Sequence, residues 1–153
     1  MIDEMDFRKS WSFFPTGVSV LAVKNQNDII HGMTASSVMS ISLDPPIIMV
    51  SVGIERSILK NLETSEFISV SLLSKDQSDI ANYFSKAHSS DNDFFYHKKD
   101  VFYIKDSLCY FMCKKNNSIK IGDHFVYFLE VKKLEFKDKP PLVWYKGKFE
   151  NSL

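Results

Sequence analysis

The stretch Gly32-Met33-Thr34-Ala35-Ser36-Ser37 continues through Ser42-Leu43-Asp44-Pro45-Pro46 into Ile47-Ile48-Met49-Val50-Ser51-Val52. It begins on an apolar strand, passes through small hydroxyl residues and a double proline, and returns as a nearly all-apolar strand. Hydroxyl groups and backbone N–H groups both donate hydrogen bonds to an anion such as a phosphate. The pattern is therefore typical of an anion-binding corner, although the same residues also occur in ordinary strands and turns.

The composition indicates one globular domain spanning residues 1–153. A chain of this length buries about 68–70% of its unfolded surface, which is enough for one substantial core. Apolar residues make up 44% and charged residues 25%, with a formal net charge of zero. A nucleic-acid-binding protein needs a basic excess to displace counterions, so this class is not expected.

The sequence gives no sign of a membrane segment or a secretory leader. No apolar run approaches the roughly 18–20 residues that span a bilayer. The N-terminus, Met1–Asp6, is acidic and therefore unlike a signal peptide. A cytoplasmic location is the expectation.

The two cysteines, Cys109 and Cys113, are expected to be plain thiols. They lie four residues apart on a predicted strand and share a face, but no further cysteine is near enough in sequence to complete a metal site. A disulfide within one extended strand would exceed the bridging distance. We therefore expect neither a metal site nor a disulfide.

Three helices are predicted. The first covers Asp3–Phe14, where Phe7, Trp11 and Phe14 recur at helical spacing and Pro15 ends the pattern. The second covers Arg56–Leu62, and the third runs from Lys75 to about Phe84 with Ser74 and Gln77 at capping-box spacing. The segment Ala87–Asp100 is polar and indicates a surface loop or a lid.

The remaining chain reads as short strands with turn signals between them. This arrangement predicts a mainly β, mainly antiparallel barrel with short peripheral helices. A long strand at His124–Leu134 favours closure, because it can bend and pair at both ends of a barrel. The other expected strands are Val18–Val23, Ile29–Thr34, Ile47–Val52, Phe67–Leu73, Val101–Ile104, Leu108–Lys114, Ile119–Ile121 and Leu142–Tyr145.

In the order of its motifs, the chain resembles the flavin reductase family of the FMN-binding split barrel, an antiparallel and Greek-key-like fold. The resemblance runs from about Phe7 to Phe149. It rests on Phe14-Pro15-Thr16-Gly17-Val18-Ser19-Val20, Gly32–Ser37, Ser42–Pro46, the strand and helix Phe67–Phe84, Gly122-Asp123-His124 and Pro141–Phe149.

The resemblance implies a set of cofactor-binding residues. Those lining the flavin would be Thr34, Ala35, Ser36, Ser37, Ser51, Val52, Phe84 and Tyr145. Arg56 and Ser57 match the family's second phosphate-binding segment, where a helix N-terminus and a fixed positive charge suit an anion. A solvated surface arginine is the alternative for Arg56.

His124 matches a family histidine beside the nicotinamide-binding face of the flavin. A neutral imidazole there would hydrogen-bond the nicotinamide carboxamide or supply a proton after hydride transfer. Its alternative is a histidine that orders the turn before the long strand. The chain departs from the family just before His88, in Phe84-Ser85-Lys86-Ala87, and at Leu129, where family members often have glycine, and in its short C-terminus.

The function implied by the resemblance is NAD(P)H:flavin oxidoreductase, with hydride passing from NADH or NADPH to FMN or FAD. A homodimer and a separate flavin-dependent monooxygenase are the implied partners. The chain lacks the G-x-G-x-x-G fingerprint, so a Rossmann unit is not expected to hold the nicotinamide nucleotide. A flavin-binding electron carrier or storage protein without turnover, or a flavin-free interaction module, would use the same fold.

Overall fold

The structure is a computed structural model that describes residues 1–86 and 92–150. Its helices are α1 (Glu4–Trp11), α2 (Leu59–Thr64) and α3 (Ser78–Ser85), with 3₁₀ turns η1 (Lys75–Gln77) and η2 (Asn92–Phe94). Its strands are β1 (Thr16–Gly17), β2 (Ser19–Lys24), β3 (Ile30–Ala35), β4 (Val38–Leu43), β5 (Pro46–Gly53), β6 (Phe67–Leu72), β7 (Phe95–Lys98), β8 (Val101–Ile104), β9 (Cys109–Ile121), β10 (His124–Phe136), β11 (Val143–Tyr145) and β12 (Lys148–Glu150).

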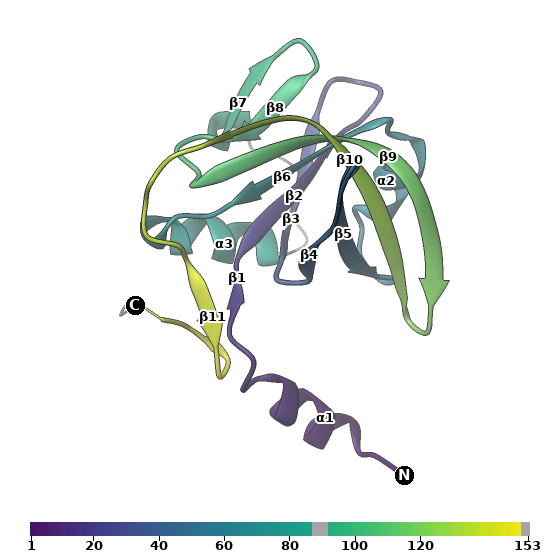
Figure 1. Cartoon of the computed structure of the whole chain (residues 1–153), viewed down its shortest axis with the longest axis vertical. Coiled ribbons are helices and arrows are strands. Elements are labelled where there is room, and N and C mark those ends of the chain that lie inside the picture. The colour runs from purple at the N-terminus through teal and green to yellow at the C-terminus, as the bar shows by residue number, and fades with distance from the viewer. Residues whose placement is uncertain (87–91, 151–153) are drawn as a thin grey trace.

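A seven-stranded antiparallel sheet forms the body of the molecule (Figure 1). Its order is β3-β2-β6-β9-β10-β5-β4, and two small sheets, β1-β11-β12 and β7-β8, accompany it. The mainly β, antiparallel prediction is confirmed. The predicted closure into a barrel is not confirmed, because hydrogen bonding among the described residues leaves β3 and β4 as the two edges of the large sheet.

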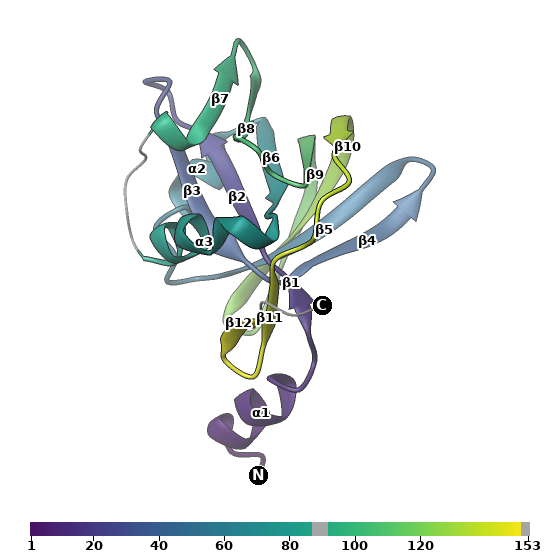
Figure 2. The ribbon, with the colours of Figure 1, turned by 90° about the vertical axis from the view of Figure 1, so that its left-hand side faces the viewer.

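The two edge strands are nevertheless consecutive in the chain. β3 ends at Ala35 and β4 begins at Val38, so only Ser36 and Ser37 join them. Three peptide links span at most roughly 11 Å. The sheet must therefore curl until its edges nearly meet at this corner, which we call the seam. Figure 2 shows β4 and β5 projecting away on the side opposite α3 and the β7–β8 hairpin.

Apolar residues cover both faces of this sheet. On β2, Leu21 and Val23 belong to one core cluster, while Val20 and Ala22 belong to the other. Side chains alternate along a strand, so β2 is buried on both sides, as its unbroken apolar run indicates. The first core lies against α2, and the second lies under α3 and the β7–β8 hairpin.

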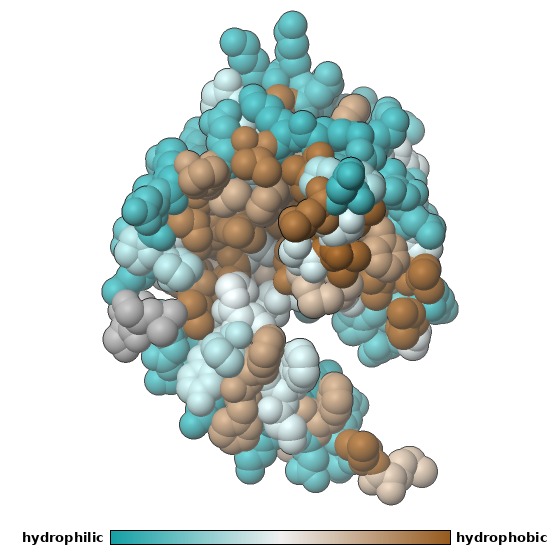
Figure 3. Space-filling view, viewed as in Figure 1, coloured by the Kyte–Doolittle hydropathy of each residue, from teal (hydrophilic) through white to brown (hydrophobic). Residues whose placement is uncertain are grey.

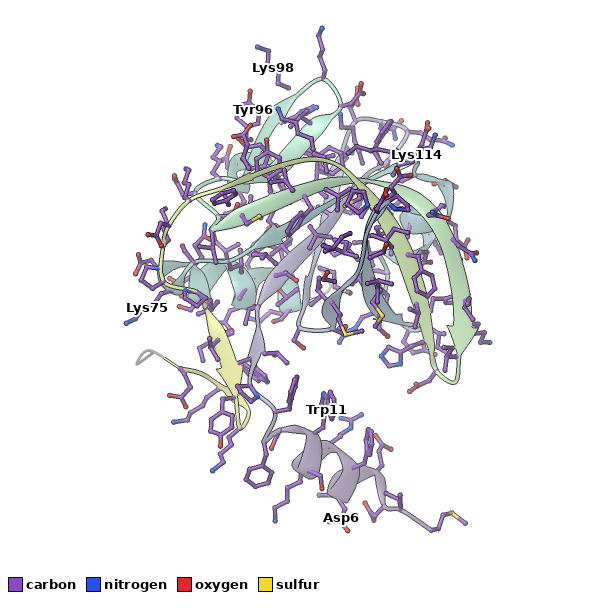
Figure 4. The ribbon with its side chains drawn as sticks, in the orientation of Figure 1. Asp6, Trp11, Lys75, Tyr96, Lys98 and Lys114 are labelled. Carbon is purple, nitrogen blue, oxygen red and sulfur yellow. The ribbon has the colours of Figure 1, made fainter. Side chains whose placement is uncertain are left out.

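The N-terminal helix lies apart from the sheet (Figure 1). Its start is capped by Asp3, whose side chain accepts a hydrogen bond of 2.6 Å from the Met5 backbone N–H. Trp11 projects from the side that faces the sheet and Asp6 from the opposite side (Figure 4). The predicted aromatic face is largely exposed within one chain, with Trp11 62% exposed and Phe7 and Phe14 similar.

Several predicted boundaries are wrong. Helix α2 begins three residues after Arg56, and β9 is a single strand where two were expected. Part of the expected polar loop forms η2 and β7, while residues 87–91, including His88, lie outside the described residues. The predicted capping box is present, because Ser74 N–H donates to Gln77 Oε1 at 3.0 Å.

Leu129 occupies a register shift between β10 and β9, where the pairing slips between Phe128 and Leu129. A bulge of this kind bends the strand, so the long hairpin curves although glycine is absent there. Leu129 itself is fully buried. Cys109 and Cys113 are free, buried thiols, as predicted, and burial raises the pKa of Cys113 to about 12.

No helix in residues 1–86 or 92–150 has the length and apolar character needed to cross a bilayer.

Candidate functional site

A cleft lies beside the seam, between β3, α3 and the β11–β12 hairpin. It has a volume of about 190 Å³. Its polar lining comes from Thr34 and Ser36 on one side and Asn82 and Ser85 on the other, and its remaining walls are Val18, Ala81, Trp144 and Phe149. Trp144 and Phe149 meet edge to face with ring centroids 4.9 Å apart. The cleft is therefore lined by an aromatic pair as well as by hydroxyl and amide groups.

Two of the seam hydroxyls are committed to the protein itself. Thr34 Oγ1 donates to the Ala81 carbonyl at 2.6 Å, which holds α3 against β3. Ser37 Oγ donates to the Ser51 carbonyl at 2.8 Å, and Ser51 N–H donates back to the Ser37 carbonyl at 3.1 Å. Among the described residues the Ser36 side chain forms no hydrogen bond, and Ser36 is exposed where it lines the cleft.

Strand β5 continues the site away from the seam. Ser51 and Gly53 lie on one face of β5, while Val52 points to the opposite face and is buried in the core. Gly53 is the register partner of His124, the first residue of β10. Because two residues of strand advance about 6–7 Å, the Ser37–Ser51 contact and His124 belong to one continuous surface.

His124 stands at the tip of the β9–β10 hairpin. Its Nδ1 lies 2.8 Å from Oδ1 of Asp123, and both side chains are accessible. The hydrogen bond from His124 lowers the pKa of the Asp123 carboxyl. A methyl group built on Gly53 would lie 3.6 Å from His124 Nε2 and 3.9 Å from Cγ of Arg56. His124, Gly53 and Arg56 therefore meet at one point.

Arg56 and Ser57 precede α2 and lie outside its first turn. The Arg56 N–H donates to the Gly53 carbonyl at 3.0 Å, so these residues form a tight turn at the end of β5. Both are exposed, and the described residues form no ion pair with Arg56. A fixed cation without an internal partner is therefore available to an external anion.

Comparison with known proteins places this geometry in a family. The model of the flavin reductase like domain matches residues 11–152. The chain belongs to this family. It is 29% identical over 153 residues to an NADH-dependent flavin reductase from a Rhodococcus species, covering 98% of this chain and 87% of that protein.

Solved structures agree with this assignment. Flavin reductase PheA2 matches with a TM-score of 0.91 and 31% identity over 99% of both chains. The styrene monooxygenase flavin reductase from Pseudomonas putida S12 matches with a TM-score of 0.87 and 28% identity, over 94% of this chain and 95% of that chain. The similarity to other flavin reductases therefore extends over nearly the whole chain.

Some residues implied by the family resemblance lie away from the cleft. Phe84 is 1% exposed and packs in the core directly beneath Gly32. Ala35 and Val52 are also buried, so they offer a ligand only their backbone groups. The Tyr145 side chain points away from the cleft because side chains alternate along a strand. Nζ of Lys146 lies 5.2 Å from the centroid of the Tyr145 ring.

Other residues that line the cleft were not predicted from the sequence. Trp144 and Phe149 are the aromatic residues at the cleft, one position from Tyr145 and Lys148 in the same family motif. Because side chains alternate along a strand, Trp144 and Tyr145 lie on opposite faces of β11. The sequence alone does not show which of these faces lines the cleft. Asn82 and Ser85 follow Ala81 on α3, and no local pattern distinguishes them from solvated helix residues.

A larger cavity of about 390 Å³ lies elsewhere, between Tyr103, Tyr110 and the end of β10. It contains none of the residues that the family resemblance implies. Among the residues that the structure describes, no group of three or more His, Cys, Asp or Glu side chains is arranged to share a metal ion. The cleft at the seam and the His124 cluster therefore remain the candidate site.

Proposed function

We propose that this chain is an NAD(P)H-dependent flavin reductase that passes hydride from NADH to FMN, with FAD as the alternative flavin. The carrying observation is that the exposed His124 and Arg56 meet beside Gly53, two residues along β5 from Ser51, which is hydrogen-bonded to Ser37 next to Ser36. NADH is favoured as the reductant because relatives across the family are named for it. When bound, the flavin supplies the redox chemistry.

The donor set of this surface fits a phosphorylated flavin. Ser36 offers a hydroxyl, and Arg56 offers a planar cation that matches phosphate in charge and geometry. The Trp144–Phe149 wall offers aromatic surface. His124 provides a nitrogen that can hydrogen-bond a nicotinamide. The chain's own contribution is to bind and orient both nucleotides and to limit water at one face.

A homodimer completes this proposal. Sites for ligands of this size usually enclose about 300–1,000 Å³, whereas the cleft of one chain has about 190 Å³. The aromatic face of α1 and the exposed Met39, Ile41 and Leu43 on β4 leave a second copy much apolar surface to cover. Figure 3 shows apolar residues gathered on the face of the sheet above α1.

We further propose the split-barrel form of this fold, with the seam as the split. The two edge strands joined by two residues, and the apolar core on each face of the sheet, support this assignment. A separate flavin-dependent monooxygenase is the proposed consumer of the reduced flavin. Support comes from relatives named as reductase components of such systems.

The direct test is steady-state oxidation of each nicotinamide nucleotide by the purified chain, followed at 340 nm, with FMN or FAD added. We expect NADH consumption that requires flavin. A protein that binds FMN, measured by quenching of flavin fluorescence, yet consumes neither NADH nor NADPH would instead be a carrier or storage protein.

Arg56→Ala tests the anion site. Charge-assisted hydrogen bonds contribute about 1.5–3 kcal/mol, so FMN affinity should fall roughly 10- to 100-fold. Riboflavin, which lacks the phosphate, should bind both proteins equally. Lys60→Ala, which removes an exposed cation on α2, is the matched control and should leave FMN affinity unchanged. Equal loss for riboflavin and FMN would contradict a phosphate role for Arg56.

A further inference from the structure

The hairpin tip carries a side-chain arrangement that family membership alone does not assign. β9 and β10 are joined by the two residues Gly122 and Asp123, and Gly122 has a φ of +58°. Glycine adopts that conformation without strain, which permits a two-residue turn. Asp123 is thereby held next to His124 at the start of β10.

Asp123 is held in place from a second side. Its backbone carbonyl accepts a hydrogen bond of 2.9 Å from the Ile54 N–H, directly after Gly53 at the end of β5. Its carboxylate accepts from His124 Nδ1 at 2.8 Å. The turn is therefore fixed to the same segment over which the imidazole lies.

The chemistry of this pair specifies a tautomer. An ionised carboxylate only accepts hydrogen bonds, so Nδ1 of His124 must carry the proton that it donates. In the neutral ring the other nitrogen, Nε2, then has a free lone pair. A free imidazole in water prefers the opposite tautomer, so the choice here depends on Asp123.

Nε2 lies over Gly53. A Cβ at position 53 would stand 3.6 Å from Nε2, and the nearest Arg56 carbon is 3.9 Å from that same point. Gly53 does not have a positive φ, so its backbone does not require glycine. Its lack of a side chain keeps the space beside Nε2 clear.

We infer that Asp123 is a positioning residue that makes His124 Nε2 a hydrogen-bond acceptor, and that Gly53 keeps open the approach of its ligand. The group that matches an acceptor nitrogen is an amide N–H donor, which the carboxamide of a reduced nicotinamide supplies. This inference rests on the proposed reductase function for the identity of the ligand, but not for the tautomer. Hydride transfer itself involves neither Asp123 nor Gly53.

The tautomer is measured on the ligand-free protein. Long-range proton–nitrogen NMR correlations of ¹⁵N-labelled protein, recorded above the usual imidazole titration range, distinguish the two forms. His124→Gln identifies the His124 signals among the four histidines. We expect the proton on Nδ1 in the wild type and largely on Nε2 in Asp123→Ala. Asp123→Asn keeps an acceptor oxygen and should restore the wild-type tautomer in part.

Kinetics then test the consequence. One neutral hydrogen bond contributes about 0.5–1.5 kcal/mol, so Asp123→Ala should raise the KM for NADH roughly 2- to 12-fold and leave the FMN Kd within about twofold. Gly53→Ala should raise the same KM without moving the tautomer. Asp138→Ala, an equal loss of exposed charge on the turn after β10, should change neither.

The outcomes separate the two proposals. A wild-type His124 with its proton on Nε2, or an unchanged tautomer in Asp123→Ala, overturns the positioning role. A changed tautomer with an unchanged KM for NADH overturns the acceptor role of Nε2. A wild type that oxidises no nicotinamide nucleotide refutes the reductase proposal and leaves the tautomer result standing.

Discussion

The seam and the tip of the β9–β10 hairpin both carry polar residues that the sequence predicts to bind a ligand. At the seam most of these groups are hydrogen-bonded within the protein, whereas at the hairpin tip they are accessible. At the corner, Thr34 and Ser37 donate their hydroxyl protons to backbone carbonyls of α3 and β5. At the tip, the exposed His124 side chain meets the exposed Arg56 side chain beside Gly53. Polar residue type therefore does not indicate availability, because partners distant in the chain decide which groups remain for a ligand.

The largest expected effect is the loss of stability when the core packing behind β3 is removed. Phe84→Ala removes a 1%-exposed ring that packs beneath Gly32 of β3, and should cost about 3–5 kcal/mol of unfolding free energy in urea titrations. Phe136→Ala, at a largely exposed position, is the control and should change stability by less than about 0.5 kcal/mol. Unchanged stability in Phe84→Ala with weakened flavin binding would make Phe84 a ligand contact.

Gly32→Ala tests the same packing from the strand side. A Cβ at Gly32 would lie 2.7 Å from the Phe84 ring, so overpacking should destabilise the protein by about 1–3 kcal/mol. Gly17→Ala meets no atom within 4 Å and serves as the matched control for added volume. If thermal unfolding of the two variants were indistinguishable, the close contact of β3 with α3 would be wrong.

Thr34→Val and Ser36→Ala compare a hydroxyl that is hydrogen-bonded within the protein with one that is available to a ligand. Thr34→Val removes the bond to the Ala81 carbonyl and should cost about 0.5–1.5 kcal/mol in stability. Ser36→Ala should leave stability unchanged and lower FMN affinity, measured by fluorescence quenching. The reverse result, in which Ser36→Ala destabilises and Thr34→Val does not, would exchange the two roles.

The smallest effect concerns acid stability at the tip. The Asp123 pKa is lowered in the folded protein by its bond to His124, so the folded state holds its proton less tightly than the unfolded chain. This stabilisation is present above the usual aspartate pKa and disappears as pH falls through the lowered value. Asp123→Ala should therefore slightly reduce the dependence of stability on pH in acid. An unchanged dependence would mean that the pair is too exposed to matter.

Local patterns predicted the elements well where local physics decides them. The capping box at Ser74 and Gln77 follows from short-range hydrogen bonding, whereas α1 ends at Trp11, three residues before the end at Phe14 that Pro15 predicted. The join between two short predicted strands into β9 was missed, because residues 115–118 are polar and their extended form depends on pairing with β10. Propensity is a weak guide where tertiary pairing decides.

The site residues stay a prediction, and the structure shows where each of them lies. Motif order placed His124, Ser36 and Arg56 in one region, and the structure brings His124 and Arg56 to the same point. Phe84 and Tyr145 were assigned to the ligand although helix and strand periodicity turn their side chains elsewhere. Asn82, Trp144 and Gly53 depend on contacts between segments that only the folded chain specifies.

The reciprocal pair of hydrogen bonds between Ser37 and Ser51 has a thermodynamic consequence. It fixes the bend between the two edge strands before any nucleotide arrives, so little backbone freedom remains to be lost on association. Flavin binding at the seam should then carry only a small conformational-entropy penalty. Calorimetry should show a more unfavourable binding entropy for Ser37→Ala than for the wild type.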